Sequence, residues 1–123
     1  TRLKNEWQEQ VAWEIKAALA HWEKAARAFG LNPPPWQPLE HAHMTIERVI
    51  DGVKTLPMDD DNLPNYYKST RDVLKPNGIT NPYGMGVIQN DDPGHLTAEY
   101  IQTKDTARAP ATIISVIETE VVK

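Results

Sequence analysis

This chain of 123 residues contains no cysteine, which excludes a disulfide scaffold, a thiolate zinc site and a cysteine nucleophile. The same absence fits a reducing compartment. The chain has two serines, Ser69 and Ser115, and neither lies in the motif of a serine nucleophile. No apolar run approaches the roughly 20 residues that a membrane-spanning helix needs, and no signal-peptide pattern appears at the start, so we expect no membrane partner.

The length predicts a single domain, residues 1–123, which is large enough to bury most of its apolar surface without a disulfide or a structural metal. The formal net charge of −4, from 17 acidic and 13 basic residues, argues mildly against a wholly basic nucleic-acid-binding surface. The two signs of charge can still be segregated onto different faces. Gly-rich phosphate-binding loops of the Walker or Rossmann type are absent.

Residues 5–29 predict a long amphipathic helix, because apolar residues recur there at steps of three and four. Asn5 is the expected N-cap, and Gly30 is the expected stop before a Pro-rich run. The apolar stripe consists of Trp7, Val11, Ile15, Ala18, Leu19, Trp22, Ala25 and Phe29. Trp13 lies off this stripe, which leaves two interpretations open: a subunit interface or the edge of the core.

Residues 41–50 alternate between apolar and polar side chains and predict a strand. Residues 62–74 predict a second helix, which tolerates Pro64 in its first turn and takes Asp61 or Asn62 as its cap. The other predicted strands are 53–56, as an extension of the first, 87–89, 95–102 and 112–120. This order predicts an α+β fold with two layers. The long N-terminal helix and the second, central helix pack on a small mixed β-sheet.

Two clusters of carboxylates carry the functional hypothesis. Asp59, Asp60 and Asp61 are consecutive; in an extended segment Asp59 and Asp61 project to one side and Asp60 to the other. A second acidic pair, Asp91 and Asp92, follows a short apolar run. Carboxylate oxygens are the hard ligands that Mg²⁺ and Ca²⁺ prefer, so the clusters predict a divalent-metal site if the fold brings them together. The alternative is a solvated acidic loop that caps a helix.

Basic residues form a candidate DNA-binding surface on one face of the second predicted helix. They are Lys68, Arg71 and Lys75, joined by Lys54 from the preceding segment. An ordinary solvated helix face is the equal alternative. On a strand, His41 and His43 point to the same side and are candidate Zn²⁺ or Mn²⁺ ligands. We favour exposed or hydrogen-bonded histidines, because no neighbouring residue completes a tetrahedral set.

The pattern Asp59-x-Asp61-Asn62-Leu63, then a helix, a Gly-containing loop and Val87-Ile88-Gln89-Asn90-Asp91-Asp92, resembles RusA-type Holliday-junction resolvases. The resemblance spans most of the chain, and its specific motifs lie within residues 56–92. It implies Mg²⁺-dependent cleavage of branched DNA by a homodimer, with Mn²⁺ as a substitute metal. The implied setting is DNA recombination and repair in the cytoplasm of a bacterial or bacteriophage-infected cell. The implied catalytic metal ligands are Asp59, Asp61 and Asp92, with Asp91 as the flanking acid.

The chain departs from the family in three places. Asn65 stands where the family has its catalytic lysine, and Lys68 is the expected substitute as an electrostatic or acid partner. The family's first N-terminal strand has no counterpart, so either that strand lies outside these 123 residues or the sheet is built differently. The loop before Val87 is also longer. A non-catalytic branched-DNA-binding or structural protein with the same fold is therefore an alternative. A third, weaker hypothesis is an oligomeric assembly protein that uses the Trp-rich first helix.

Overall fold

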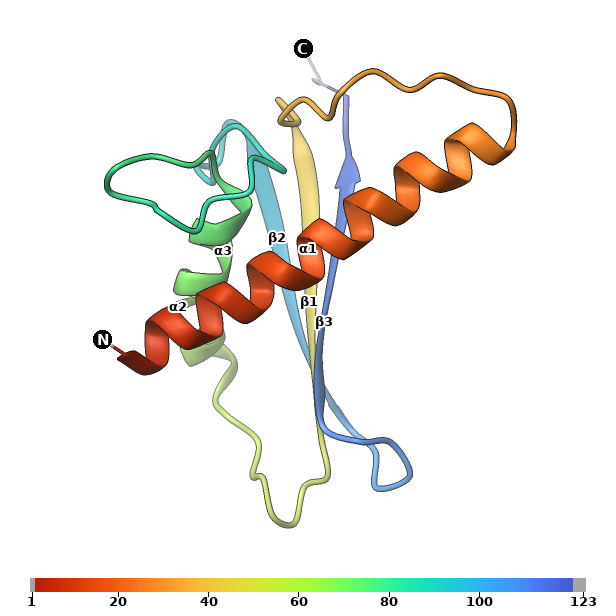
Figure 1. Ribbon diagram of the computed structural model, residues 1–123. Helices are drawn as coiled ribbons and strands as arrows, with labels where there is room; N and C mark the ends of the chain where they lie inside the picture. Colours follow the sequence, from red (N-terminus) through yellow and green to blue (C-terminus); the bar gives the residue numbers. More distant parts are fainter. Residues whose placement is uncertain (1, 121–123) are drawn as a thin grey trace.

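The computed structural model describes residues 2–120 and confirms a small two-layer α+β fold (Figure 1). Its elements are α1 (Arg2–Ala28), β1 (Ala42–Ile50), a 3₁₀ turn (Asp60–Asn62), α2 (Leu63–Tyr66), α3 (Lys68–Leu74), β2 (Leu96–Lys104) and β3 (Ala111–Glu118). The three strands form one mixed sheet in the order β2-β1-β3. No helix within the described residues is long and apolar enough to cross a membrane.

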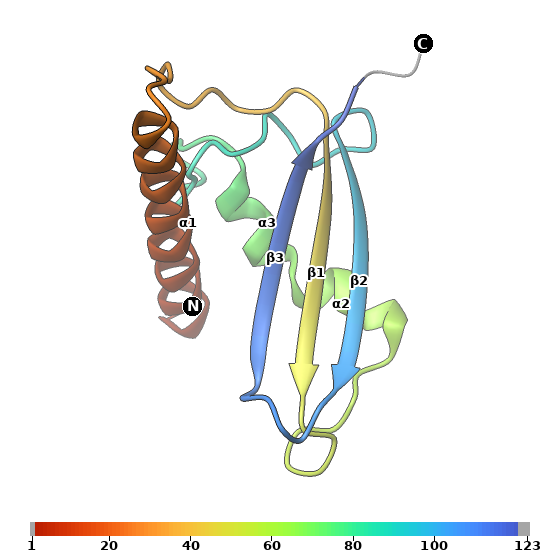
Figure 2. The ribbon, with the colours of Figure 1, turned by 90° about the vertical axis from the view of Figure 1, so that its right-hand side faces the viewer.

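The central strand β1 pairs in parallel with β2 and antiparallel with β3. Ala42, at its start, lies opposite both Leu96 of β2 and Glu118 of β3. The alternation predicted for this strand is confirmed, because Ala42, Met44 and Ile46 are all buried. Their side chains share a core with residues of α2 and α3, which cover one face of the sheet (Figure 2).

Helix α1 begins at Arg2, so the predicted N-cap Asn5 lies inside the helix and that assignment was wrong. Gly30, with φ of 79°, follows the helix as expected, because glycine adopts this left-handed backbone without strain. Two of the residues in α1, Gln8 and Val11, are buried. Most of the predicted apolar stripe therefore stays partly or fully open, and Phe29 is 85% exposed.

α1 is attached to α3 rather than to the sheet. The indole N–H of Trp7 donates to the Thr70 hydroxyl at 2.8 Å, and the Gln8 amide donates to the backbone oxygen of Ser69 at 3.0 Å. In Figure 2, α1 lies to the side of β3, beyond the edge of the sheet. The first helix thus packs on the second layer but leaves its flank toward β3 uncovered.

The second predicted helix is divided into two. Pro64 lies in the first turn of α2 as expected, but the helix breaks at Tyr67, whose ψ is 13°. The Tyr67 ring is 1% exposed and its hydroxyl contacts that of Thr112 on β3 at 3.0 Å. Burial of this side chain and its bond to the sheet accompany the break. The contact with Thr112 comes from a distant strand, so helical periodicity does not reveal the break at Tyr67.

Two short predicted strands were wrong. Residues 53–56 form no strand: residues 53–55 are bends, because the Asp51 carboxylate accepts hydrogen bonds from the three successive backbone N–H groups of residues 53, 54 and 55. Residues 87–89 do not join the sheet; Ile88 forms an isolated bridge with Leu39. In the first segment a local side chain competes with extension of the sheet, and in the second the backbone N–H groups donate to the distant oxygens of Leu39 and Leu74.

Replacing Leu63 by Ala is expected to lower the free energy of unfolding by about 2–5 kcal/mol, the usual cost of a core Leu→Ala cavity. The reason is that Leu63 is 1% exposed within the core. Urea unfolding followed by circular dichroism measures the change. Leu56→Ala is the control, since Leu56 is 70% exposed. Equal stability of the two variants would contradict the burial of the motif leucine.

Candidate metal centre

The first acidic cluster lies in the segment that leaves β1 and enters the 3₁₀ turn. Asp59, Asp60 and Asp61 are all exposed. Asn62, one of the two predicted caps, makes no side-chain capping bond, and neither does Asp59 at the start of the 3₁₀ turn. Within residues 2–120, none of the three carboxylates has a hydrogen-bond or ion-pair partner. Three neighbouring negative charges without a counter-charge repel one another, and a bound cation would relieve that repulsion.

The second acidic pair lies at the loop that leads into β2 and is compensated. Lys75 at the end of α3 reaches Asp91 at 3.7 Å and Asp72 at 3.1 Å. One carboxylate oxygen of Asp92 accepts from the His95 ring nitrogen Nδ1 and from the Gly94 backbone N–H, both at 2.9 Å. This pair therefore has local partners that the triple aspartate lacks.

The structure does not bring the two clusters together. The backbone N–H of Met58 donates to the Gln102 side chain at 2.9 Å, which sets the start of the triple aspartate beside the far end of β2. Asp92 lies before the near end, where its backbone oxygen accepts from the N–H of Leu96. Gln102 lies six positions after Leu96 along the strand, or about 20 Å at roughly 3.3 Å per residue. In Figure 1 the two segments lie at opposite ends of the sheet.

One copy of the chain therefore does not assemble the expected ligand set. Within the described part of the chain, no group of three or more His, Asp or Glu side chains is placed to hold a metal ion. Asp59 and Asp61 remain together, and Asp91 and Asp92 remain together. Asp72 was not among the predicted site residues, yet Lys75 pairs with it as well as with Asp91; the spacing of three between Asp72 and Lys75 was the available signal.

The predicted basic face is only partly exposed. Lys68, at the start of α3, is exposed, and so is Lys54 in the bend after β1. Arg71 instead turns toward the sheet and donates to the Tyr100 hydroxyl at 3.1 Å. Lys75 forms ion pairs with the carboxylates of Asp72 and Asp91. Asn65, at the family's lysine position, is exposed on α2.

The histidines do not form the pair that alternation along a strand suggested. His41 bonds to the Gly94 backbone oxygen at 3.0 Å, and His43 bonds to the Thr97 hydroxyl at 2.7 Å. His41 instead stacks on His95, with ring centroids 5.9 Å apart and planes within 9°. The favoured interpretation of hydrogen-bonded histidines agrees with these contacts.

Comparison with known proteins adds no relative: no family model, curated protein or solved structure matches this chain. The resemblance to RusA-type resolvases accordingly stands on the residues of the two motifs alone. The metal and the activity that it implies remain proposals, and their support has to come from the charges and positions described above.

In the metal-free protein, the Asp92 carboxyl is expected to titrate below its ordinary pKa of 3.8, chiefly because the His95 side chain hydrogen-bonds to its ionised form. A lowered pKa in the folded state means that the contribution to stability is complete above pH 3.8 and is lost as the pH falls through the lowered value. Carbon-detected NMR titration of the carboxyl measures the pKa directly.

His95→Ala should raise that Asp92 pKa toward 3.8, whereas His43→Ala should leave it unchanged because His43 contacts Thr97. An Asp92 pKa that does not respond to loss of His95 would show that the hydrogen bond is not its cause.

Proposed function

We propose that the chain is a divalent-metal-dependent, structure-specific DNA endonuclease of the RusA type. It acts as a homodimer on Holliday junctions or other branched DNA, in the cytoplasm of a bacterial or bacteriophage-infected cell. The observation that carries the proposal is the uncompensated triple aspartate at Asp59–Asp61. It opens the helical segment as the Asp-x-Asp-Asn-Leu motif requires, with Leu63 anchored in the core.

The separation of the acidic clusters sets a condition on this function. With about 20 Å between them in one chain, Asp59 and Asp61 need acids from another source to complete a centre. A two-fold axis perpendicular to the strands, placed between two copies side by side, reverses one copy end for end relative to the other. The end with Asp59 and Asp61 then lies beside the partner copy's end that carries the Asp91–Asp92 pair. The homodimer is therefore the assembly in which the metal centre forms, twice per dimer.

The charges suit this arrangement. Asp59 and Asp61 supply carboxylates that have no protein partner, and Asp92 keeps one oxygen free of the His95 and Gly94 contacts. Mg²⁺, or Mn²⁺ in its place, would supply charge stabilisation and an activated water for phosphodiester hydrolysis. Exposed Lys68 is the basic side chain nearest in sequence to the family's lysine position, and it is free to approach a phosphate.

Cleavage of a labelled four-way junction is expected only with Mg²⁺ or Mn²⁺. Asp61→Asn should reduce the rate roughly 10³-fold, because metal catalysis supplies several kcal/mol of transition-state stabilisation. Asp60→Asn is the matched control: it removes the same charge from the same turn, but from the residue expected not to bind the metal, and should retain most activity. Equal losses in both variants would indicate a general charge effect rather than ligation.

Co-expression of Asp61→Asn and Asp92→Asn subunits tests the shared centre. Each variant alone is expected to be inactive. In a mixed dimer one centre carries both substitutions and the other carries neither. Random pairing makes about half of the dimers mixed, so about a quarter of all centres are intact and about a quarter of the parent activity should return. If both acids of a centre came from one chain, mixing would restore nothing. Junction cleavage at equal protein concentration distinguishes the two results.

A non-catalytic branched-DNA-binding protein is the second candidate. Asn65 in place of the family's lysine favours it, as does the absence of a three-acid group within one copy of residues 2–120. Tight binding of a four-way junction in Mg²⁺ without any cleavage would select this function over the nuclease.

A further inference from the structure

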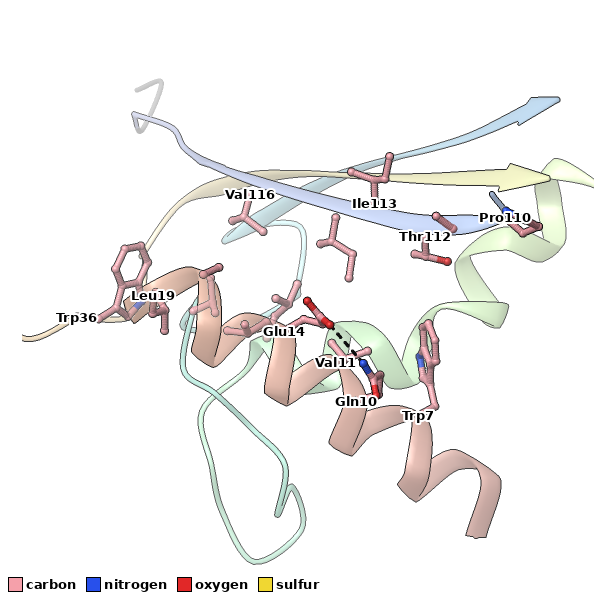
Figure 3. Close-up of a pocket in the computed structure, with 16 residues that line it drawn as sticks. Trp7, Gln10, Val11, Glu14, Leu19, Trp36, Pro110, Thr112, Ile113 and Val116 are labelled. Atoms are coloured by element: carbon pink, nitrogen blue, oxygen red, sulfur yellow. Dashed lines mark hydrogen bonds between the residues drawn. The ribbon is translucent and has the colours of Figure 1, made fainter. Parts of the chain in front are cut away.

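A groove of about 810 Å³ separates α1 from β3. From α1 it is lined by the buried Val11 and the partly exposed Ile15 and Leu19, and from β3 by Thr112 and Val116 (Figure 3). The groove is open to solvent, and exposed apolar surface of this kind is typical of binding sites.

The outer edge of β3 carries unpaired backbone groups. The Thr119 backbone N–H donates to the His41 oxygen, so residues of odd number in β3 bond to β1. The backbone groups of Thr112, Ile114 and Val116 therefore point away from the sheet. Their side chains line the groove, so one row of residues offers both hydrogen bonds and apolar contacts.

The central residues of β3 lack two common features that protect an edge strand from pairing. Residues 112–117 read Thr-Ile-Ile-Ser-Val-Ile and contain no charge and no proline, both of which disfavour pairing at a strand edge. One further polar group lacks a partner at the groove: the buried indole N–H of Trp36 has no acceptor among the described residues. A backbone carbonyl in the groove would provide one.

We propose that the groove binds an extended segment of a partner polypeptide, which adds to the sheet as a strand antiparallel to β3. A helix or a small apolar molecule would fill the space but leave the outward backbone groups of β3 unpaired, whereas a strand satisfies them. Side chains on the strand's groove-facing side, at alternate positions, are apolar and contact α1. This binding mode requires neither metal nor DNA and stands apart from the proposed nuclease function.

Charge specifies one position of the partner. Glu14 is the single charged residue among those that line the groove, and it lies midway along α1. Its carboxylate accepts from the Gln10 amide at 3.3 Å and has no basic partner among the described residues. The partner strand therefore carries a lysine or arginine at a groove-facing position, between apolar residues.

The probe is a capped eight-residue peptide in which Val, Lys, Val and Val alternate with Thr. At ten times its dissociation constant it should slow amide exchange about tenfold at Ile114 and Val116, whose N–H groups face outward. Ile113 and Ile117 already bond to β1 and should change little. The indole N–H resonance of Trp36 should shift. The control peptide is N-methylated at the Val and Lys positions, whose N–H groups face β3, and should bind at least tenfold more weakly.

Glu14→Lys should weaken binding of the lysine peptide about threefold, as expected for loss of a partly exposed ion pair. The same variant should bind more tightly to a peptide with Glu in place of that lysine. Glu9→Lys makes the same charge change on α1 at a residue outside the groove and should have no such effect. Equal binding of the methylated peptide, or no protection at Ile114 and Val116, would overturn the proposal. Protection without peptide that rises with protein concentration would also overturn it, in favour of a second copy.

Discussion

The parallel pairing of β1 with β2 is the constraint on which the rest of the structure depends. Parallel neighbours cannot be joined by a hairpin, so the chain that leaves the end of β1 has to return along the sheet before β2 begins. α2, α3 and the loop that follows make this return. Leu63, Tyr67 and Leu74 are buried against the sheet along the way and hold the crossover in place.

The same crossover determines what the acidic residues are able to do. The triple aspartate lies where the crossover begins and Asp91–Asp92 where it ends, so a full strand length separates them. A metal centre that uses both has to draw on two copies, which gives the proposed homodimer a chemical reason beyond symmetric cutting. Lys75 forms an ion pair with Asp91, and His95 hydrogen-bonds to Asp92, whereas the carboxylates of the triple aspartate face only solvent.

β3 and α1 lie at the other side of the molecule and are less constrained. β3 has a neighbour on one side only, and α1 is held mainly through Trp7 and Gln8 to α3. Together they leave an apolar groove beside a free strand edge. The sheet and its crossover thus form the packed core, while the groove between α1 and the edge of β3 has room for the proposed additional strand.

The sequence by itself determined the long first helix, the three strands of the sheet, the α+β class and the burial of one side of β1, because periodicities of 3.6 and 2 residues are local properties. It also identified the two acidic clusters. Tertiary structure alone decided the break at Tyr67, the loss of strand character at residues 87–89 and the exposure of most of α1. It also decided that the acidic clusters lie apart. Spacing along the chain contains no information on which end of a sheet a loop reaches; strand direction and the crossover decide that, and both are set by contacts between distant residues.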